Sequence, residues 1–326
     1  MQGADYLQGV YLLPLKHIVF GMHVPPEGLS FEQMKSICLN AEELGYDLFT
    51  ITDHFMNMAQ PEGPDRHPLE CWSTLAGLAA VTSKIRLGPL VSCYYYRLPT
   101  VLGKIATTVD IISNGRLIFG IGAGWHQKEF EGFMGRFPPV KERMTGLEET
   151  IQICSRMFEN ERTSFNGKLY HLENVLNVPL PVQRPPPIMV GGGGEKKTLR
   201  IAAKYASISH CAFNPSMEAL DHTISVLKKH CEAVNRDFSE IKVGISVNPF
   251  LGLTEGEVEA KIKKRAEQLG LTLDEFRKRL GPVKGAPEKC IEAMNGYIDK
   301  GVSLFTMTFP QLEDAKLFSD EVILKL

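Results

Sequence analysis

An aspartate and a histidine stand together at a position where a strand is expected to end. Asp53 and His54 directly follow the apolar run Leu48–Thr52. A histidine can move a proton near neutral pH, and a carboxylate can orient or charge it. Adjacent residues of an extended chain point to opposite faces, so the two side chains need not enter one pocket. We predict acid–base chemistry here; the alternative is an aspartate that caps a loop beside a packed histidine.

Four consecutive glycines, Gly191–Gly194, lie between an apolar run and a helical segment that opens with Glu195-Lys196-Lys197-Thr198. Glycine permits a positive φ and leaves backbone N–H groups unobstructed, and a helix N-terminus carries partial positive charge. Together with Lys196 and Lys197, this pattern predicts a cradle for phosphate or carboxylate. A tight strand-to-helix turn is the structural alternative.

A second glycine-rich stretch, Gly120-Ile121-Gly122-Ala123-Gly124, lacks the third glycine of a dinucleotide-binding fingerprint. We instead expect Gly122 and Gly124 to let the backbone approach a flat ring.

His126 and Glu129 have the spacing of two metal ligands, but no third ligand is evident, so no metal site is predicted. Further upstream, the segment Val91–Arg97 contains three tyrosines that could stack on a ring or pack the fold.

Composition excludes several classes of function. The chain has 326 residues, with 36 Lys and Arg against 38 Asp and Glu, so its net charge of −2 gives no general attraction for nucleic acid or acidic membranes. Its seven cysteines form no CxxC motif and are expected to be reduced thiols in the cytoplasm. No apolar run approaches the about 18 residues that a membrane span needs. No signal peptide, serine nucleophile elbow or phosphate-binding P-loop is found.

Short apolar runs alternate with segments of helical period along the whole chain. The predicted strands are Ile18–Val24, Leu48–Thr52, Ile85–Val91, Leu117–Ile121, Pro187–Val190, Ala206–Phe213, Lys242–Val247 and Ser303–Thr308. These runs are almost continuously apolar, as expected of parallel strands buried on both faces. Eight strands alternating with helices favour an α/β fold of the (β/α)8 TIM-barrel type.

Long polar segments interrupt this regular pattern. Residues 53–69 and 122–141 follow the second and fourth strands, and in a barrel such loops at the C-terminal face build the active site. Residues 160–186 form an inserted excursion, in which Asn166-Gly167 predicts a hairpin turn between Thr163–Phe165 and Lys168–Tyr170. This excursion could wrap over the barrel mouth. Residues 1–16 are an N-terminal extension of a single domain covering 1–326.

Several segments resemble the bacterial luciferase-like monooxygenase superfamily, especially its branch that depends on the deazaflavin coenzyme F420. The resemblance spans roughly residues 18–310. It is carried by Gly45–Asp47, Thr52–Phe55, Thr82–Gly88, Arg97–Pro99, Asp110–Leu117, Gly122–Trp125, Glu129-Phe130, Gly191–Arg200 and Gly285–Glu288. Relatives tend to carry an aspartate and an asparagine where this chain has Ser207 and His210, so we expect a different pocket polarity there.

The resemblance implies a barrel mouth that binds a flavin-shaped ring. Asp53 and His54 would lie against the deazaflavin, with His54 as the proton donor or acceptor. Glu129 matches a family position and is expected to be catalytic or structural. The implied coenzyme-binding residues also include the bulge that supports the ring, in which the family often has a non-prolyl cis peptide, and both glycine-rich turns. They are Asp53, Val91, Ser92, Cys93, Tyr94, Gly122, Gly124, Gly191, Gly192, Gly193 and Gly194.

The expected activity is hydride transfer between coenzyme F420 and a small organic substrate. One alternative is an FMN-dependent monooxygenase that uses reduced flavin and O2, and a second is a non-catalytic flavin-binding relative. Family members commonly dimerise, so a homo-oligomer, a dimer, is implied. Neither nucleic acid nor a membrane is expected as a partner.

Overall fold

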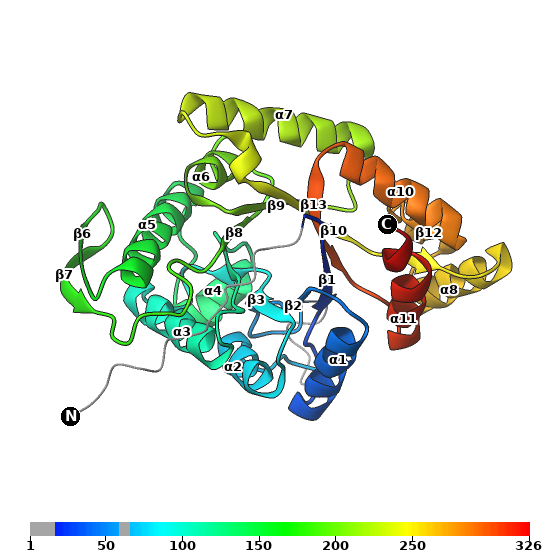
Figure 1. Cartoon of the computed structure of the whole chain (residues 1–326), viewed down its shortest axis with the longest axis horizontal. Coiled ribbons are helices and arrows are strands. Elements are labelled where there is room, and N and C mark those ends of the chain that lie inside the picture. Colours follow the sequence, from blue (N-terminus) through cyan, green and yellow to red (C-terminus); the bar gives the residue numbers. More distant parts are fainter. Residues whose placement is uncertain (1–16, 59–65) are drawn as a thin grey trace.

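Parallel strands form a barrel and helices surround it (Figure 1). The structure is a computed structural model that describes residues 17–58 and 66–326. The barrel strands are β1 (Val19–Val24), β2 (Leu48–Ile51), β3 (Arg86–Pro89), β4 (Ser92–Cys93), β5 (Phe119–Gly122), β8 (Ile188–Gly191), β9 (Ile208–Phe213), β10 (Lys242–Val247) and β13 (Val302–Met307). Their order is β3-β2-β1-β13-β10-β9-β8-β5-β4, and every pair along it is parallel.

The barrel closes because β3 and β4 together occupy one strand position. The two segments are separated by Leu90 and Val91; β4 pairs with β5, and a bridge joins Leu87 to Leu117. The nine segments therefore fill eight positions, which confirms the predicted barrel. All eight predicted strands are present, and only the third is interrupted. The extension predicted at 1–16 lies outside the described residues.

The barrel interior is apolar near the start of the strands and more polar towards their carboxyl ends. Side chains near the start of the strands form one buried interior cluster: Val19, Leu48, Ile118, Met189, Ile208 and Leu304. Because residues two apart on a strand point to the same side, the next interior positions include Gly21, Thr50, His210 and Thr306. Small and polar residues thus replace bulky ones towards the carboxyl ends of the strands.

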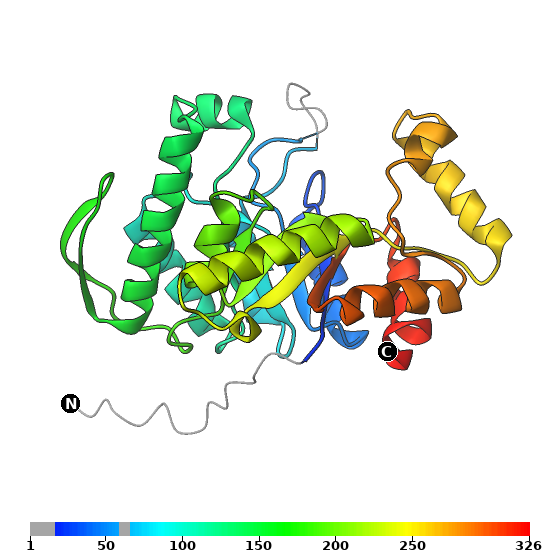
Figure 2. The ribbon, with the colours of Figure 1, turned by 90° about the horizontal axis from the view of Figure 1, so that it is seen from above.

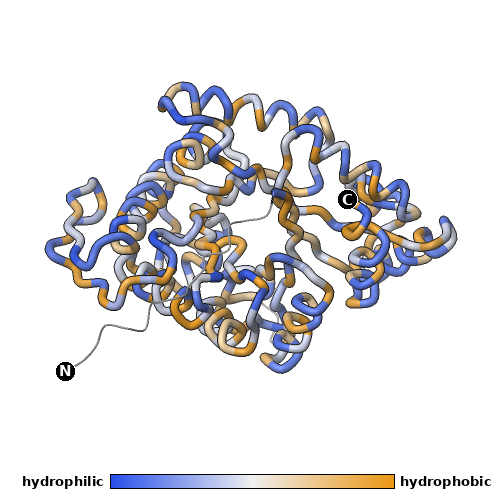
Figure 3. The backbone as a smooth tube through the Cα atoms, viewed as in Figure 1, coloured by the Kyte–Doolittle hydropathy of each residue, from blue (hydrophilic) through white to orange (hydrophobic). Residues whose placement is uncertain are grey.

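Helices cover the outside of the barrel (Figures 1 and 2). They are α1 (Phe31–Glu43), α2 (Cys71–Val81), α3 (Pro99–Ile112), α5 (Val140–Glu159), α6 (Thr198–Tyr205), α7 (Met217–Ala233), α10 (Pro287–Asp299) and α11 (Leu312–Glu321), with 3-10 turns at Phe238–Glu240 and Ile323–Lys325. Ser30 caps the N-terminus of α1 and forms a capping box with Gln33. Hydrophobic residues concentrate along the central strands and on parts of the surrounding helices (Figure 3).

Further elements lie on the loops that follow the strands. Helix α4 (Gln127–Met134) follows β5. Between β10 and α10 lie β11 (Phe250–Leu251), α8 (Glu255–Gln268), α9 (Leu273–Arg277) and β12 (Lys284–Gly285), and β11 pairs with β12. Helices α8 and α9 pack around their own small apolar cluster beside the barrel (Figure 2). No helix in 17–58 or 66–326 combines the length and the apolar character of a membrane span.

The predicted excursion contains a hairpin, but its turn and its place differ from the prediction. Strand β6 (Arg162–Asn166) pairs with β7 (His171–Leu176), so residues 167–170 form the turn. The carboxylate of Glu149 accepts the N–H groups of Lys168, Leu169 and Tyr170, and these amides therefore do not pair with β6. The hairpin packs on the outer side of α5 rather than over the mouth.

Candidate active site

A cavity of about 590 Å³ opens at the carboxyl ends of the barrel strands, where barrel active sites lie. Its lining comes from nearly all the strand positions: His23, Asp53, His54, Leu90, Val91, Cys93, Tyr96, Gly122, Ala123, Gly124, Trp125, Gly191, Gly192, Thr198, His210, Cys211, Ala212, Phe213 and Ser246. The volume suits a small-molecule ligand. Asp53, His54 and members of both glycine-rich turns lie together on this lining.

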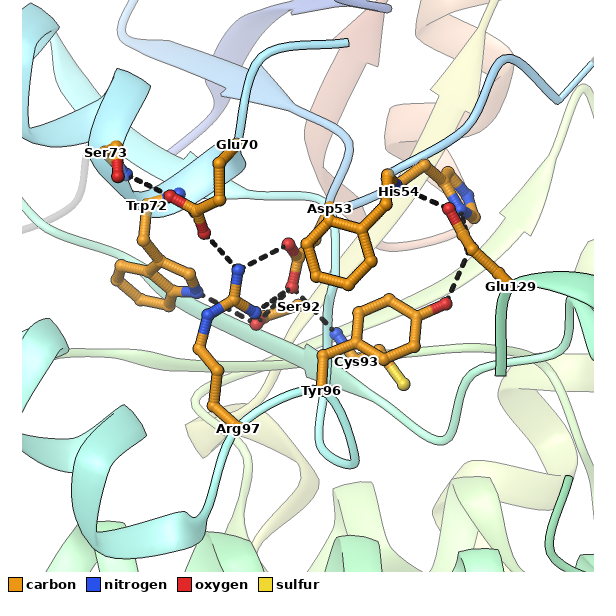
Figure 4. Close-up of polar contacts among 11 residues, drawn as sticks. Asp53, His54, Glu70, Trp72, Ser73, Ser92, Cys93, Tyr96, Arg97 and Glu129 are labelled. Atoms are coloured by element: carbon orange, nitrogen blue, oxygen red, sulfur yellow. Dashed lines mark hydrogen bonds and ion pairs between the residues drawn. The ribbon is translucent and has the colours of Figure 1, made fainter. Parts of the chain in front are cut away.

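Asp53 is held in a buried ion pair at the end of β2 (Figure 4). Arg97 donates from Nη1 to Oδ2 at 2.7 Å and from Nη2 to Oδ1 at 2.9 Å. The hydroxyl of Ser92 donates to Oδ2 at 2.7 Å, and the backbone N–H of Cys93 donates to it at 3.2 Å. Asp53 therefore ties the interrupted third strand to β2.

Arg97 extends this network away from the cavity to Glu70, which caps α2. Burial lowers the pKa of Arg97, but the hydrogen bonds and charges of Asp53 and Glu70 outweigh it and raise that pKa above its ordinary value. Burial also raises the pKa of Glu70, whereas bonds from Ser73 and Arg97 bring it below its ordinary value. Arg97 and Glu70 are therefore charged at neutral pH.

His54 belongs to a separate network (Figure 4). Its Nδ1 lies 2.8 Å from Oε2 of Glu129, a residue of α4 whose side chain is fully buried. The same oxygen accepts the hydroxyl of Tyr96 at 2.6 Å. The other oxygen accepts the backbone N–H groups of Phe55 and Met56. Adjacent residues in sequence, Asp53 and His54, thus have different partners.

The bonds to Glu129 keep it ionised. Burial alone would raise its pKa, but hydrogen bonds from His54, Tyr96 and Phe55 lower it below its ordinary value. Burial, followed by nearby negative groups, raises the pKa of Tyr96, so the phenol keeps its proton. An ionised carboxylate facing Nδ1 favours the tautomer with hydrogen on Nδ1. In that tautomer Nε2 of His54 carries no hydrogen, and no hydrogen bond joins it to another described residue.

Val91 forms a wall of the cavity at the break between β3 and β4. The peptide bond between Leu90 and Val91 is cis and non-prolyl, in the segment where the resemblance implied one. A methyl group at Gly122 would lie 2.7 Å from Cγ2 of Val91, and one at Gly191 would lie 2.7 Å from Cγ1. These two glycines therefore make room for the valine side chain, a reason that the sequence pattern did not reveal.

The other predicted residues of this bulge divide into two groups. Cys93 lines the cavity, and burial raises the pKa of its thiol to about 12, so it is not a thiolate at neutral pH. Gly124, with φ of +69°, adjoins it: a methyl group there would lie 2.6 Å from the sulfur of Cys93. Ser92 and Tyr94 are buried outside the cavity lining, where Ser92 accepts from Nε1 of Trp72 and Tyr94 packs on α5 at Gly146.

The four-glycine turn reaches the cavity with its first half only. Gly191 and Gly192 line the cavity with Thr198, whereas Gly193 and Gly194 are exposed. Lys196 and Lys197 line a separate hollow of about 130 Å³ beside α5 and α6, with Arg200 and Glu148 on its wall. The predicted positive charge therefore lies next to the glycine turn but outside the main cavity.

His126 has a structural role. It caps α4, because its Nδ1 accepts the N–H of Glu129 at 3.3 Å. Its spacing to Glu129 therefore reflects a helix cap. Across 17–58 and 66–326, no group of three or more His, Cys, Asp or Glu side chains is arranged to hold a metal ion.

Sequence reasoning missed several polar residues of the site. Arg97, Tyr96 and Glu70 complete the two networks, and His23 and Ser246 line the cavity. His210, noted as a departure from relatives, also lines it, while the nearby Ser207 does not. One signal was present: His23 and His210 place imidazole rings within strands that are largely apolar.

Sequence and structure comparisons agree on the kind of protein that this chain resembles. The family model described as luciferase-like monooxygenase matches residues 17–288. The F420-dependent glucose-6-phosphate dehydrogenase of Kineococcus radiotolerans is 26% identical over 335 residues, which cover 95% of this chain and 96% of that protein.

Solved structures share the fold at low sequence identity. An F420-dependent secondary alcohol dehydrogenase in complex with an F420-acetone adduct aligns with a TM-score of 0.79 at 16% identity, covering 94% of this chain and 98% of that one. A riboflavin lyase with modified FMN and riboflavin aligns with a TM-score of 0.83 at 14% identity, covering 95% and 91%. These likenesses support the barrel fold.

Proposed function

Since the chain belongs to the luciferase-like monooxygenase family, we propose that it is an oxidoreductase dependent on coenzyme F420 that transfers a hydride to or from a small organic substrate. The support is the F420 dependence in the names of its relatives, together with a cavity whose residues suit both a flat ring and a proton transfer. The coenzyme supplies hydride donation or acceptance, and the protein supplies binding, placement and proton transfer.

The residues of the cavity fit such a coenzyme. Val91 and the glycines that accommodate it offer a flat, largely apolar wall for a ring. Gly192 has φ of +119° and lies beside Thr198 at the N-terminus of α6. Open backbone at a helix N-terminus suits a phosphate. We propose that this turn holds the phosphate side of the coenzyme and that Lys196 and Lys197 contribute longer-range attraction.

The proton that accompanies the hydride is assigned to His54. His54 lines the cavity, and Glu129 fixes its ring through Nδ1, which leaves Nε2 as the nitrogen that exchanges a proton with the substrate. In substrate oxidation Nε2 accepts the proton that the substrate loses, and in reduction it returns that proton. Glu129 positions His54 and stabilises its protonated form. Asp53 has a positioning role: its carboxylate accepts hydrogen bonds from Arg97, Ser92 and Cys93, and it thereby fixes the backbone at the end of β2.

One observation carries the proposal: a buried, ionised Glu129 aligns His54, a histidine on the lining of a cavity large enough for a ring. The test is turnover of candidate alcohols and carbonyl compounds by the protein loaded with coenzyme F420, with and without O2. Hydride transfer predicts equal rates in both conditions. Turnover that requires both FMN and O2 would establish the FMN-dependent monooxygenase instead.

Assembly and location are part of the same proposal. We propose that the enzyme is a cytoplasmic homodimer that acts on a small molecule without nucleic acid or a membrane. All seven cysteines are buried free thiols, which suits a reducing compartment. Size-exclusion chromatography with light scattering tests the dimer, and a monomer at micromolar concentration would refute it.

A further inference from the structure

A second group of polar side chains lies on the cavity wall and takes no part in the networks of Asp53 and His54. His23 on β1, His210 on β9 and Ser246 on β10 line the cavity, and Thr306 on β13 lies behind them. We call these four residues the polar wall. Their strands are neighbours in the order β1-β13-β10-β9, on the side of the barrel across from β3 and its bulge.

Hydrogen bonds fix the side chains of the polar wall. Thr306 Oγ1 lies 2.9 Å from Nε2 of His210 and 2.8 Å from the hydroxyl of Ser246, and it donates to the carbonyl of Ile245 at 3.4 Å. On β1, Nδ1 of His23 lies 3.0 Å from Oγ1 of Thr50. Each ring thus has one side-chain partner, and its other nitrogen has no side-chain partner among the described residues.

The polar wall lies inside the barrel, where its polar groups need hydrogen-bond partners. It lies directly above the apolar cluster of the barrel interior, where a polar group without a partner is costly. Glycine makes space for it, because a methyl group at Gly244 would lie 3.0 Å from Cδ2 of His210. The rings also contact backbone carbonyl groups, His23 that of Thr50, and His210 its own and that of Ile245. A ligand that both donates and accepts hydrogen bonds would add partners to these cavity-lining rings and to the hydroxyl of Ser246.

The electrostatics of the polar wall favour a neutral ligand group. Burial lowers the pKa of His23 to about 4, and burial together with His23 lowers that of His210 to about 4, so both rings are uncharged at neutral pH. The described residues lining the cavity include no lysine or arginine. An anion placed here would lose its hydration without gaining a cation.

We propose that the polar wall binds an uncharged hydroxyl or carbonyl group of the substrate, and that it selects against substrates carrying phosphate or carboxylate at that end. The assignment of this group to the substrate rests on the proposed function, in which the coenzyme ring occupies the side of Val91. The preference for neutral over anionic groups rests on the polar wall alone.

The test uses acetamide and acetate, which share a shape and differ in charge. Each is titrated at pH 7 into the full-length protein, with and without coenzyme F420, while the ring ¹⁵N–¹H signals of His23 and His210 are followed by NMR. We expect saturable shifts with acetamide and at least about tenfold weaker binding of acetate. Equal or tighter binding of acetate, or unmoved signals at molar acetamide, would overturn the proposal.

Variants locate the binding site. His210→Phe and Ser246→Ala are each expected to weaken acetamide binding at least about fivefold, a loss typical of one or two hydrogen bonds. His171→Asn, on the exposed strand β7 far from the cavity, is the matched control and should bind as the unmodified protein does. Unchanged acetamide affinity in both wall variants, with the folded NMR spectrum retained, would also refute the proposal. Failure of F420 to bind would remove the proposed function while leaving this charge comparison intact.

Discussion

Replacing Glu129 by glutamine should preserve the shape of the site but change which ring nitrogen of His54 carries hydrogen. In the native protein the carboxylate accepts from His54, Tyr96 and the backbone N–H groups of Phe55 and Met56. A glutamine oxygen can accept only part of these four bonds, and its NH2 group can only donate. If that NH2 faces Nδ1 of His54, the ring takes the other tautomer, with hydrogen on Nε2. The proton acceptor of the cavity is then lost.

The expected magnitudes follow from the number of bonds. Loss of two charge-assisted bonds, at about 1.5–3 kcal/mol each, should lower the free energy of unfolding by about 3–6 kcal/mol. Loss of the proton acceptor should lower kcat by about 10²–10⁴-fold, while the Kd for coenzyme F420 changes by less than about threefold. Urea unfolding, ¹⁵N NMR of the ring of His54 and steady-state kinetics measure the three quantities.

Glu131→Gln is the matched control on the same helix. Glu131 is exposed and accepts from Gln127 at 2.7 Å, so its replacement should change stability by less than about 0.5 kcal/mol. A Glu129→Gln variant that retains kcat within about threefold, with Nε2 of His54 still unprotonated, would refute the assigned role of Glu129.

Three further outcomes are expected. Arg97→Met removes the ion-pair partner of the buried Asp53 carboxylate and should lower the free energy of unfolding, measured in urea, by about 3–5 kcal/mol. A decrease below about 1 kcal/mol would contradict the stabilising role of this ion pair. Gly191→Ala places a methyl group 2.7 Å from Val91 and should weaken F420 binding, with partial recovery in Gly191→Ala/Val91→Ala; equal affinity in all three proteins would contradict this packing. Both histidines of the polar wall have folded pKa values of about 4, below the unfolded value of about 6.5, so their contribution to stability is complete above about pH 6.5 and is lost as the pH falls towards 4. Unfolding measured between pH 7 and 4.5 should show this decline, and a variant with glutamine at both positions that declines equally would refute it.

The barrel was predictable from sequence because its strands are buried on both faces. Largely apolar, buried runs such as Leu48–Ile51 mark the strands, and helical stripes separate them. The break in the third strand was not predictable from the residues, since Leu90 and Val91 continue its apolar run. The hairpin turn was misplaced because Glu149, a residue of a preceding helix, binds the amides that the local pattern assigns to a strand.

The site was predictable where residues capable of acid–base chemistry directly follow a predicted strand, as Asp53 and His54 do. Their partners were not, because Arg97 and Glu129 lie 44 and 75 positions away from them in the sequence. Local patterns give no distance between such positions. Of the polar wall, only His210 was noted from the sequence, because the role of a histidine within a largely apolar strand depends on its neighbours across the barrel.

The proposed function depends on binding of a deazaflavin in the barrel for hydride transfer. A paired fluorescence titration of the purified protein with coenzyme F420 and with FMN tests this binding. We expect a Kd in about the micromolar range for F420 and much weaker binding of FMN. Tight FMN binding with weak F420 binding would contradict it and indicate an oxygen-dependent flavin enzyme, whereas binding of neither would indicate a non-catalytic relative.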